Sequence, residues 1–104
     1  MNAPNSPCKL LTIICEAELE SALIRELPAL GANGYTITDA RGRGAHGTRD
    51  AAWTPGANIR VEVLCSEPTA LAIAEHLERR YYADYAMVLF VSEVAVLRPA
   101  KFSP

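Results

Sequence analysis

The chain has no long apolar run and little from which a covalent or metal-held scaffold could be built. Across 104 residues no stretch approaches the roughly twenty apolar residues of a membrane-spanning helix, and the start, MNAPNSP, lacks the basic and apolar regions of a signal peptide. Cys8, Cys15 and Cys65 form no Cys-x-x-Cys pair and lie in apolar segments. This pattern argues against a disulfide framework or a zinc–thiolate site. We therefore expect one cytoplasmic domain, residues 1–104, with buried free thiols.

The sequence also lacks the usual signs of catalysis. We find no paired nucleophile and base, no metal-ligand spacing and no Walker sequence, because the glycine-rich stretch GRGAHGTR does not end in Gly-Lys-Ser or Gly-Lys-Thr. We therefore predict that the protein is not an enzyme and that it holds no metal and no obligatory cofactor.

Apolar patterning near the start predicts a strand followed by a helix. Lys9–Cys15, KLLTIIC, has apolar residues at both odd and even positions, which is typical of a strand covered on both faces. Glu16–Leu30 then has leucines at helical spacing and glutamates in its first turns, where the helix dipole favours carboxylates. Pro28 and Gly31 mark the end of this helix.

Two further predicted strands flank the glycine-rich stretch. Tyr35–Arg41 alternates with one partly polar face, and Asn58–Ser66 alternates with Ile59, Val61 and Val63 on its apolar face. We expect these strands to pair as a hairpin. Its loop, residues 41–57, is far longer than the roughly four to six residues of most connections in compact domains.

The last part of the chain predicts a second helix and a fourth strand. Ser66 or Thr69 can cap a helix that begins near Glu67, and His76 is expected to be a partly exposed surface residue of this helix. The fourth strand is expected at Ala86–Leu97, AMVLFVSEVAVL. The apolar stripe predicted for the second helix consists of Leu71, Ala74, Leu77 and Tyr81.

The long loop is a basic segment in a mildly acidic protein. The chain carries 12 acidic and 10 basic residues, yet Arg41, Arg43, His46 and Arg49 share a run that contains no carboxylate. Glycines between them allow positive φ and close backbone approach, so amides and guanidinium groups can surround one anion. We predict that a phosphate-bearing small ligand orders this loop.

The predicted order of elements is β-α-β-β-α-β. With right-handed crossovers, this order gives a ferredoxin-like sandwich, in which a four-stranded antiparallel sheet carries two helices on one face. The other face has no helix, although several strands are apolar at both parities. Because an exposed apolar sheet face of that size is unusual in a monomer, we expect a symmetric homo-oligomer whose sheets face inward.

Several motifs, in their order along the chain, resemble the PII signal-transduction superfamily. They are the Gly34-Tyr35-Thr36 start of the second strand, the Gly-Arg-Gly start of the long loop, and the segment Val91-Ser-Glu-Val-Ala-Val-Leu-Arg. Within the superfamily the chain is similar to the PII-like proteins of bicarbonate uptake and carboxysomes, which share a Tyr-x-x-Asp-Tyr-Ala segment matched here at Tyr81–Ala86. The likeness covers nearly the whole chain.

This resemblance implies a homotrimer with adenine-nucleotide sites in the clefts between subunits, and a long flexible loop that signals their occupancy to a partner. The positions that the resemblance assigns to the adenine pocket are Gly34, Tyr35, Thr36, Glu62, Val63 and Leu64. The positions that it assigns to the phosphates are Arg43, His46 and Arg49.

The chain departs from nitrogen-sensing PII proteins at their triphosphate-binding loop, which is glycine-rich and carries a lysine. Tyr82–Met87 replaces it here, and the tyrosine that is uridylylated at the tip of the long loop in those proteins is missing. The resemblance therefore implies ADP or AMP rather than ATP. It also suggests bicarbonate as a second ligand at Arg41, Arg43 and Arg49, and a bicarbonate transporter or a carboxysome-associated protein as partner.

The alternative is a ferredoxin-like nucleic-acid-binding module that uses the Arg/Gly loop, since the same sandwich carries RNA-recognition modules. The predicted strands lack the solvent-facing aromatic pairs on which bases stack, and a net charge of −2 does not favour binding of a polyanion. We therefore prefer a regulator that senses adenine nucleotides in inorganic-carbon uptake or carboxysome function, with slow nucleotide hydrolysis left open as a side activity.

Overall fold

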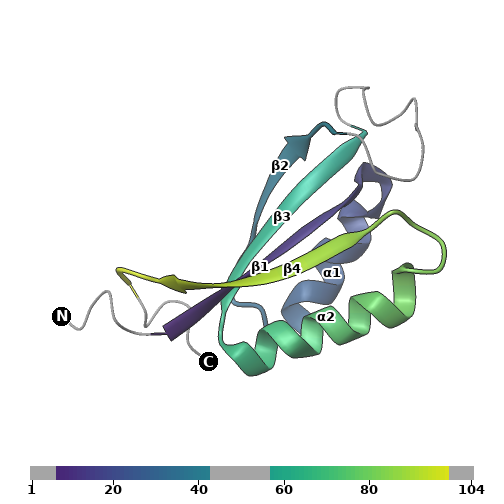
Figure 1. The fold of residues 1–104 in the computed structure, drawn as a ribbon. Helices are drawn as coiled ribbons and strands as arrows, with labels where there is room; N and C mark the ends of the chain where they lie inside the picture. The colour runs from purple at the N-terminus through teal and green to yellow at the C-terminus, as the bar shows by residue number, and fades with distance from the viewer. Residues whose placement is uncertain (1–6, 43–56, 99–104) are drawn as a thin grey trace.

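The protein is a four-stranded antiparallel sheet with two α-helices packed on one face (Figure 1). The computed structural model describes residues 7–42 and 57–98. In chain order the elements are β1 (Pro7–Glu16), a 3-10 turn η2 (Ala17–Leu19), α1 (Glu20–Ala29), β2 (Thr36–Ala40), β3 (Asn58–Cys65), α2 (Glu67–Tyr81) and β4 (Val88–Ala95). The order of strands in the sheet is β2-β3-β1-β4, which confirms the predicted ferredoxin-like topology.

The predicted hairpin of the second and third strands is also confirmed. Strands β2 and β3 pair antiparallel from Thr36 opposite Glu62 to Ala40 opposite Asn58. Most of the long loop that joins them, residues 43–56, lies outside the described residues.

The core lies between the sheet and the helices. Leu11 and Ile13 of β1 are fully buried, and β3 alternates strictly, so that its buried residues pack under the helices. The first helix contributes Leu23 and Leu27, as the leucine spacing predicts.

The three cysteines, all at positions in the sheet, are free and buried, as predicted. Burial raises the pKa of Cys15 to about 12. Burial and the neighbouring Cys8 raise the pKa of Cys65 to about 11. These two thiols are therefore protonated at neutral pH and are poor nucleophiles.

The first helix starts later than the sequence predicts. Glu16 is the last residue of β1, where it pairs with Asn58 of β3, and its side chain accepts a hydrogen bond from the Ala86 amide at 3.0 Å. The chain then forms the 3-10 turn before α1 begins at Glu20. Asn58 and Ala86 are both far from Glu16 in the sequence, so local helical patterning did not reveal these two contacts.

The apolar stripe predicted for the second helix is partly wrong. Ala70 and Ile73 are buried together with Leu77 and Tyr81, whereas Leu71 is 58% exposed. Leu71 lies about 100° around the helix from Ala70, at the edge of the face that packs on the sheet. The predicted start of the helix is confirmed, because the Ser66 hydroxyl accepts a hydrogen bond from the Thr69 amide.

The other predicted strands differ from the observed strands by one or two residues at their ends. Strands β2 and β4 are each shorter at both ends than predicted, and β3 ends at Cys65. Gly31 has a φ of 107°, which confirms it as the glycine that ends α1. No helix within the described residues has the length and apolar character needed to cross a membrane.

Candidate functional site

The positions assigned to the adenine pocket lie together where β2 starts beside β3. Thr36 is opposite Glu62 in the β2–β3 register, and the exposed Gly34 and Tyr35 precede it. Leu64 follows Glu62 on the same face of β3 and is half-buried. Tyr35 is 37% exposed, so its ring is accessible to a ligand.

Val63 differs from the other five positions. Its side chain is fully buried in the core under the helices, and it pairs with Leu11 of β1. In this structure Val63 can therefore support the pocket through its backbone and its packing, and its side chain is not accessible.

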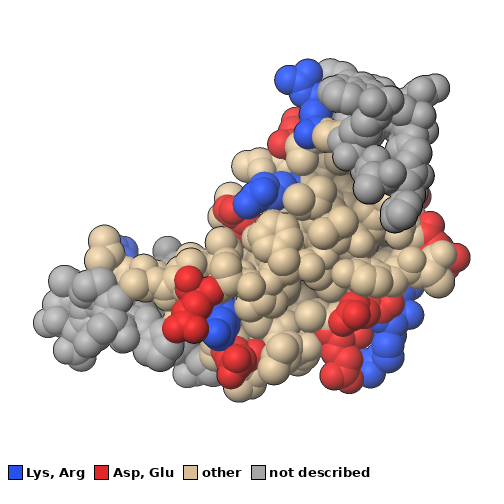
Figure 2. Space-filling view, viewed as in Figure 1, with Lys and Arg blue, Asp and Glu red and all other residues tan. Residues whose placement is uncertain are grey.

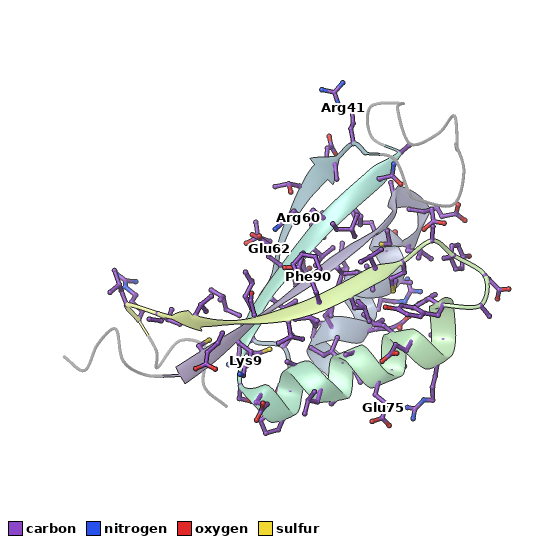
Figure 3. All side chains as sticks on the ribbon, viewed as in Figure 1. Lys9, Arg41, Arg60, Glu62, Glu75 and Phe90 are labelled. Carbon is purple, nitrogen blue, oxygen red and sulfur yellow. The ribbon has the colours of Figure 1, made fainter. Side chains whose placement is uncertain are left out.

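Of the four basic positions predicted to hold anions, the described residues include only Arg41. It follows β2 directly, is exposed, and projects beyond the end of the sheet (Figure 3). Arg43, His46 and Arg49 lie outside the described residues.

An ion pair that the sequence did not predict involves Glu62, one of the adenine positions. Arg60 Nε is 3.3 Å from Glu62 Oε2, and both side chains project from β3 on the face without helices (Figure 3). The side chains are 41% and 39% exposed, so the pair contributes little to stability. It does hold the Glu62 carboxylate in place beside Thr36.

The sheet face opposite the helices is largely apolar around this pair. Figure 2 shows a mostly uncharged surface over the middle of this face. Val88 and Phe90 of β4 are 52% and 44% exposed, and Leu10 and Ile14 of β1 are half-buried beside them. An apolar face of this kind fits the predicted self-association.

Thr12 lies at the centre of the same face, between Glu62 and Phe90 in the registers of the neighbouring strands. Its side chain is fully buried, and its Oγ1 has no hydrogen-bond partner within the described residues. A buried hydroxyl without a partner carries a desolvation cost, so Thr12 weakens the isolated subunit.

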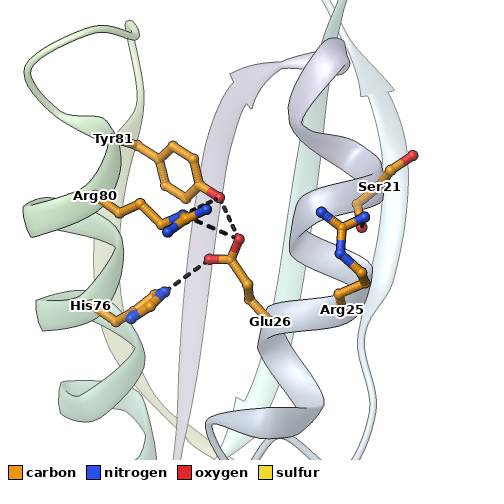
Figure 4. A network of polar contacts seen from close by, with 6 residues as sticks. All are labelled: Ser21, Arg25, Glu26, His76, Arg80 and Tyr81. Carbon is orange, nitrogen blue, oxygen red and sulfur yellow. Dashed lines mark hydrogen bonds and ion pairs between the residues drawn. The ribbon is translucent and has the colours of Figure 1, made fainter.

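A polar network joins the two helices on their own side of the sheet (Figure 4). Glu26 of α1 accepts hydrogen bonds from His76 Nε2 at 2.8 Å and from the Tyr81 hydroxyl at 2.5 Å. Arg80 Nε lies 3.4 Å from the same carboxylate. His76 is partly exposed as predicted, but its partner was missed because 50 residues separate it from Glu26.

The network shifts the pKa of Glu26. Burial raises this pKa, but the hydrogen bonds from Tyr81 and His76 and the charge of Arg80 together outweigh burial, and the pKa is lowered from 4.5. Glu26 is therefore a carboxylate at neutral pH. Burial and the hydrogen bond to Glu26 raise the pKa of Tyr81, which keeps its proton.

Two of the three tyrosines near the end of α2 pack against each other, and the third is exposed. Tyr81 is buried, and its ring contacts Tyr85 edge-on with centroids 5.8 Å apart. Tyr82 is 43% exposed. Within the described residues, no group of three histidine, cysteine or acidic side chains is placed to hold a metal ion.

The fold, with candidate ligand positions where its second and third strands meet, is that of PII-like signalling proteins. A family model described as Nitrogen regulatory protein P-II matches residues 8–101, and the chain belongs to this family. The family membership and the fold predicted from the sequence are thus confirmed, and trimeric assembly is consistent with them.

Three solved structures illustrate the likeness. A PII-like signaling protein from Thermus thermophilus is 46% identical over 92% of this chain and 95% of that chain, with a TM-score of 0.78. CPII from Thiomonas intermedia, bound to ADP, AMP and bicarbonate, is 27% identical over 98% of this chain and 100% of that chain, with a TM-score of 0.83. CPII bound to ADP and bicarbonate is 28% identical over 96% of this chain and 99% of that chain, with a TM-score of 0.82.

Proposed function

We propose that this PII-like protein senses adenine nucleotides, ADP or AMP, together with bicarbonate, and signals in inorganic-carbon uptake or carboxysome function. The observation that carries the proposal is the similarity to CPII, which matches nearly the whole chain and which binds ADP, AMP and bicarbonate. The sites lie in clefts between the subunits of a homotrimer, and the loop at residues 41–57 reports their occupancy to a transporter or a carboxysome-associated protein.

The placement of the described positions supports this proposal. Gly34, Tyr35 and Thr36 precede and begin β2 opposite Glu62 of β3, and Arg41 follows the other end of β2. Five strand residues span roughly 17 Å, which is comparable with an extended adenine nucleotide. A nucleotide with its base at Tyr35 and Thr36 therefore directs its phosphates toward Arg41 and the basic residues beyond it.

The test is isothermal titration calorimetry with AMP, ADP and ATP on the wild-type chain and on the double variant Arg43→Ala/Arg49→Ala. Each charge-assisted hydrogen bond to phosphate is worth about 1.5–3 kcal/mol, so the loss of two should cost about 3 kcal/mol or more, and the double variant should bind ADP at least about a hundredfold more weakly. The matched control is Arg25→Ala/Arg79→Ala, which removes the same charge from exposed helix positions. Equal affinities in the two double variants would exclude the loop arginines as phosphate ligands.

Bicarbonate is tested by the same titrations with and without millimolar bicarbonate. If it binds beside the phosphates at Arg41, Arg43 and Arg49, it raises nucleotide affinity, and nucleotide must raise bicarbonate affinity by the same factor. Trp53, the only tryptophan, lies in the same loop and provides a fluorescence readout. If the nucleotide affinity is the same with and without bicarbonate, the protein senses the nucleotide alone.

A further inference from the structure

The turn between α2 and β4, residues 82–87, uses its backbone amides internally. The amides of Tyr82, Asp84, Tyr85 and Ala86 donate hydrogen bonds at 3.3, 3.1, 3.0 and 3.0 Å. The first three donate to carbonyl oxygens at the end of α2. The last donates to Glu16 Oε2, at the end of β1. These four amides are therefore not available to an anion from solution.

Glu16 does more than occupy one amide. Its carboxylate accepts a charge-assisted hydrogen bond from the Ala86 amide. A phosphate that approached this amide would have to displace the carboxylate and would be repelled by its negative charge. The turn itself adds a second, exposed carboxylate at Asp84, and residues 82–87 contain no lysine or arginine. Glu16 and Asp84 thus place two carboxylates around the turn.

The strand registers place Glu16 close to the basic side of the same end. Ala40, Asn58 and Glu16 lie in one row across β2, β3 and β1, and Arg41 follows Ala40. Two strand spacings, roughly 10 Å, separate the backbone at the end of β2 from the backbone of Glu16. At about 10 mM salt, where the Debye length is about 30 Å, a phosphate chain held at Arg41 therefore lies within the electrostatic range of Glu16.

We propose that Glu16 is a specificity-determining residue, whose carboxylate on the Ala86 amide disfavours long phosphate chains and so selects AMP and ADP over ATP. This inference rests on the proposed function, because it concerns the phosphate end of the same nucleotide site. The ligand is an adenosine phosphate. The effect of Glu16 on affinity increases with the negative charge of the phosphate chain and does not depend on the base.

The test uses Glu16→Gln, which removes the charge and retains an oxygen that accepts the Ala86 hydrogen bond, so the turn remains anchored. Dissociation constants for AMP, ADP and ATP are measured by calorimetry at low ionic strength. ATP carries about two more negative charges than AMP. For charges roughly 10 Å apart in water at about 10 mM salt, removing one carboxylate should raise the ATP/AMP affinity ratio by up to about threefold. The gain should shrink at physiological salt.

Two further variants make the result specific. Glu75→Gln removes the same charge from the outer side of α2, where Glu75 pairs with Arg79 and lies away from the turn (Figure 3), and the ratio should not change. Asp84→Asn removes the exposed carboxylate of the turn, and the ratio should rise in the same direction as in Glu16→Gln.

The outcomes separate this inference from the proposed function. If all three nucleotides bind but Glu16→Gln changes the ATP/AMP ratio no more than Glu75→Gln does, Glu16 does not determine specificity, although the nucleotide site stands. If the wild-type chain binds no adenine nucleotide, the proposed function fails and this inference fails with it.

Discussion

Replacement of Glu26 by alanine should destabilise the protein far more than loss of an ordinary surface acid. The Glu26 side chain is only 16% exposed, and it accepts hydrogen bonds from Tyr81 and His76 across the helix pair. Glu26→Ala leaves the largely buried Tyr81 hydroxyl without its acceptor. It also removes the one carboxylate that faces His76 and Arg80 in Figure 4.

The magnitude follows from the exposure of each donor. A hydrogen bond to a charged acceptor contributes about 1.5–3 kcal/mol when buried, which applies most directly to Tyr81. His76 is 30% exposed, so water replaces part of its bond, and Arg80 is 59% exposed, so its ion pair adds little. We expect a loss of about 2 kcal/mol in the free energy of unfolding, which corresponds to about 8 °C in Tm.

The assay is urea unfolding followed by far-UV circular dichroism at a fixed protein concentration, because subunit association also contributes to stability. Glu75→Ala is the control, since Glu75 pairs with Arg79 at 69–70% exposure and should cost less than about 0.5 kcal/mol. A Glu26→Ala variant as stable as Glu75→Ala would refute the assignment. A double-mutant cycle with Tyr81→Phe should give a coupling energy of about 1 kcal/mol.

The same residue predicts a pH dependence. The pKa of Glu26 is lower in the folded chain than its ordinary value of 4.5, so its contribution to stability is complete above pH 4.5 and is lost as the pH falls through the lower folded value. The stability difference between wild type and Glu26→Ala should therefore be largest at neutral pH and shrink in this acid range. A difference that stays constant down to about pH 3 would contradict this linkage.

Three other outcomes are expected. Light scattering should give about three times the chain mass of 11.3 kDa, and Phe90→Asp should reduce it toward the monomer value, because Phe90 lies on the apolar sheet face. Thr12→Val should raise the free energy of unfolding by about 1 kcal/mol, since it removes a buried hydroxyl that has no partner within the described residues. A lower free energy of unfolding would indicate that the hydroxyl has a partner in a neighbouring subunit. Cys8, Cys15 and Cys65 should react with a thiol reagent at about pH 8 only after unfolding, and fast labelling of the native protein would contradict their burial.

The sequence determined the order and type of the four strands and two α-helices, although not the 3-10 turn η2, because each of these elements depends on neighbours close along the chain. Strict alternation in β3 places its apolar residues on one face, and the φ of 107° at Gly31 is one that glycine adopts without strain. The serine at position 66 provides a cap to the helix that follows it. These signals are local, so they can be read without a structure.

The candidate site was predictable only in part. The hairpin of β2 and β3 brings Thr36 next to Glu62, which two adjacent strands already suggest. That Val63 turns its side chain into the core also follows from alternation. The Arg60–Glu62 pair, by contrast, depends on side-chain conformations that the sequence does not specify.

Only the tertiary structure decided which distant residues meet. Glu26 contacts His76 and Tyr81 across 50 and 55 residues of sequence, and Glu16 contacts Ala86 across 70. Leu71 is exposed because the helix packs on the sheet through a neighbouring face, although its spacing fits an apolar stripe. A periodic pattern specifies that a helix has an apolar face, but the rotation of that helix on the sheet, and therefore its partners, is set by packing of the whole core.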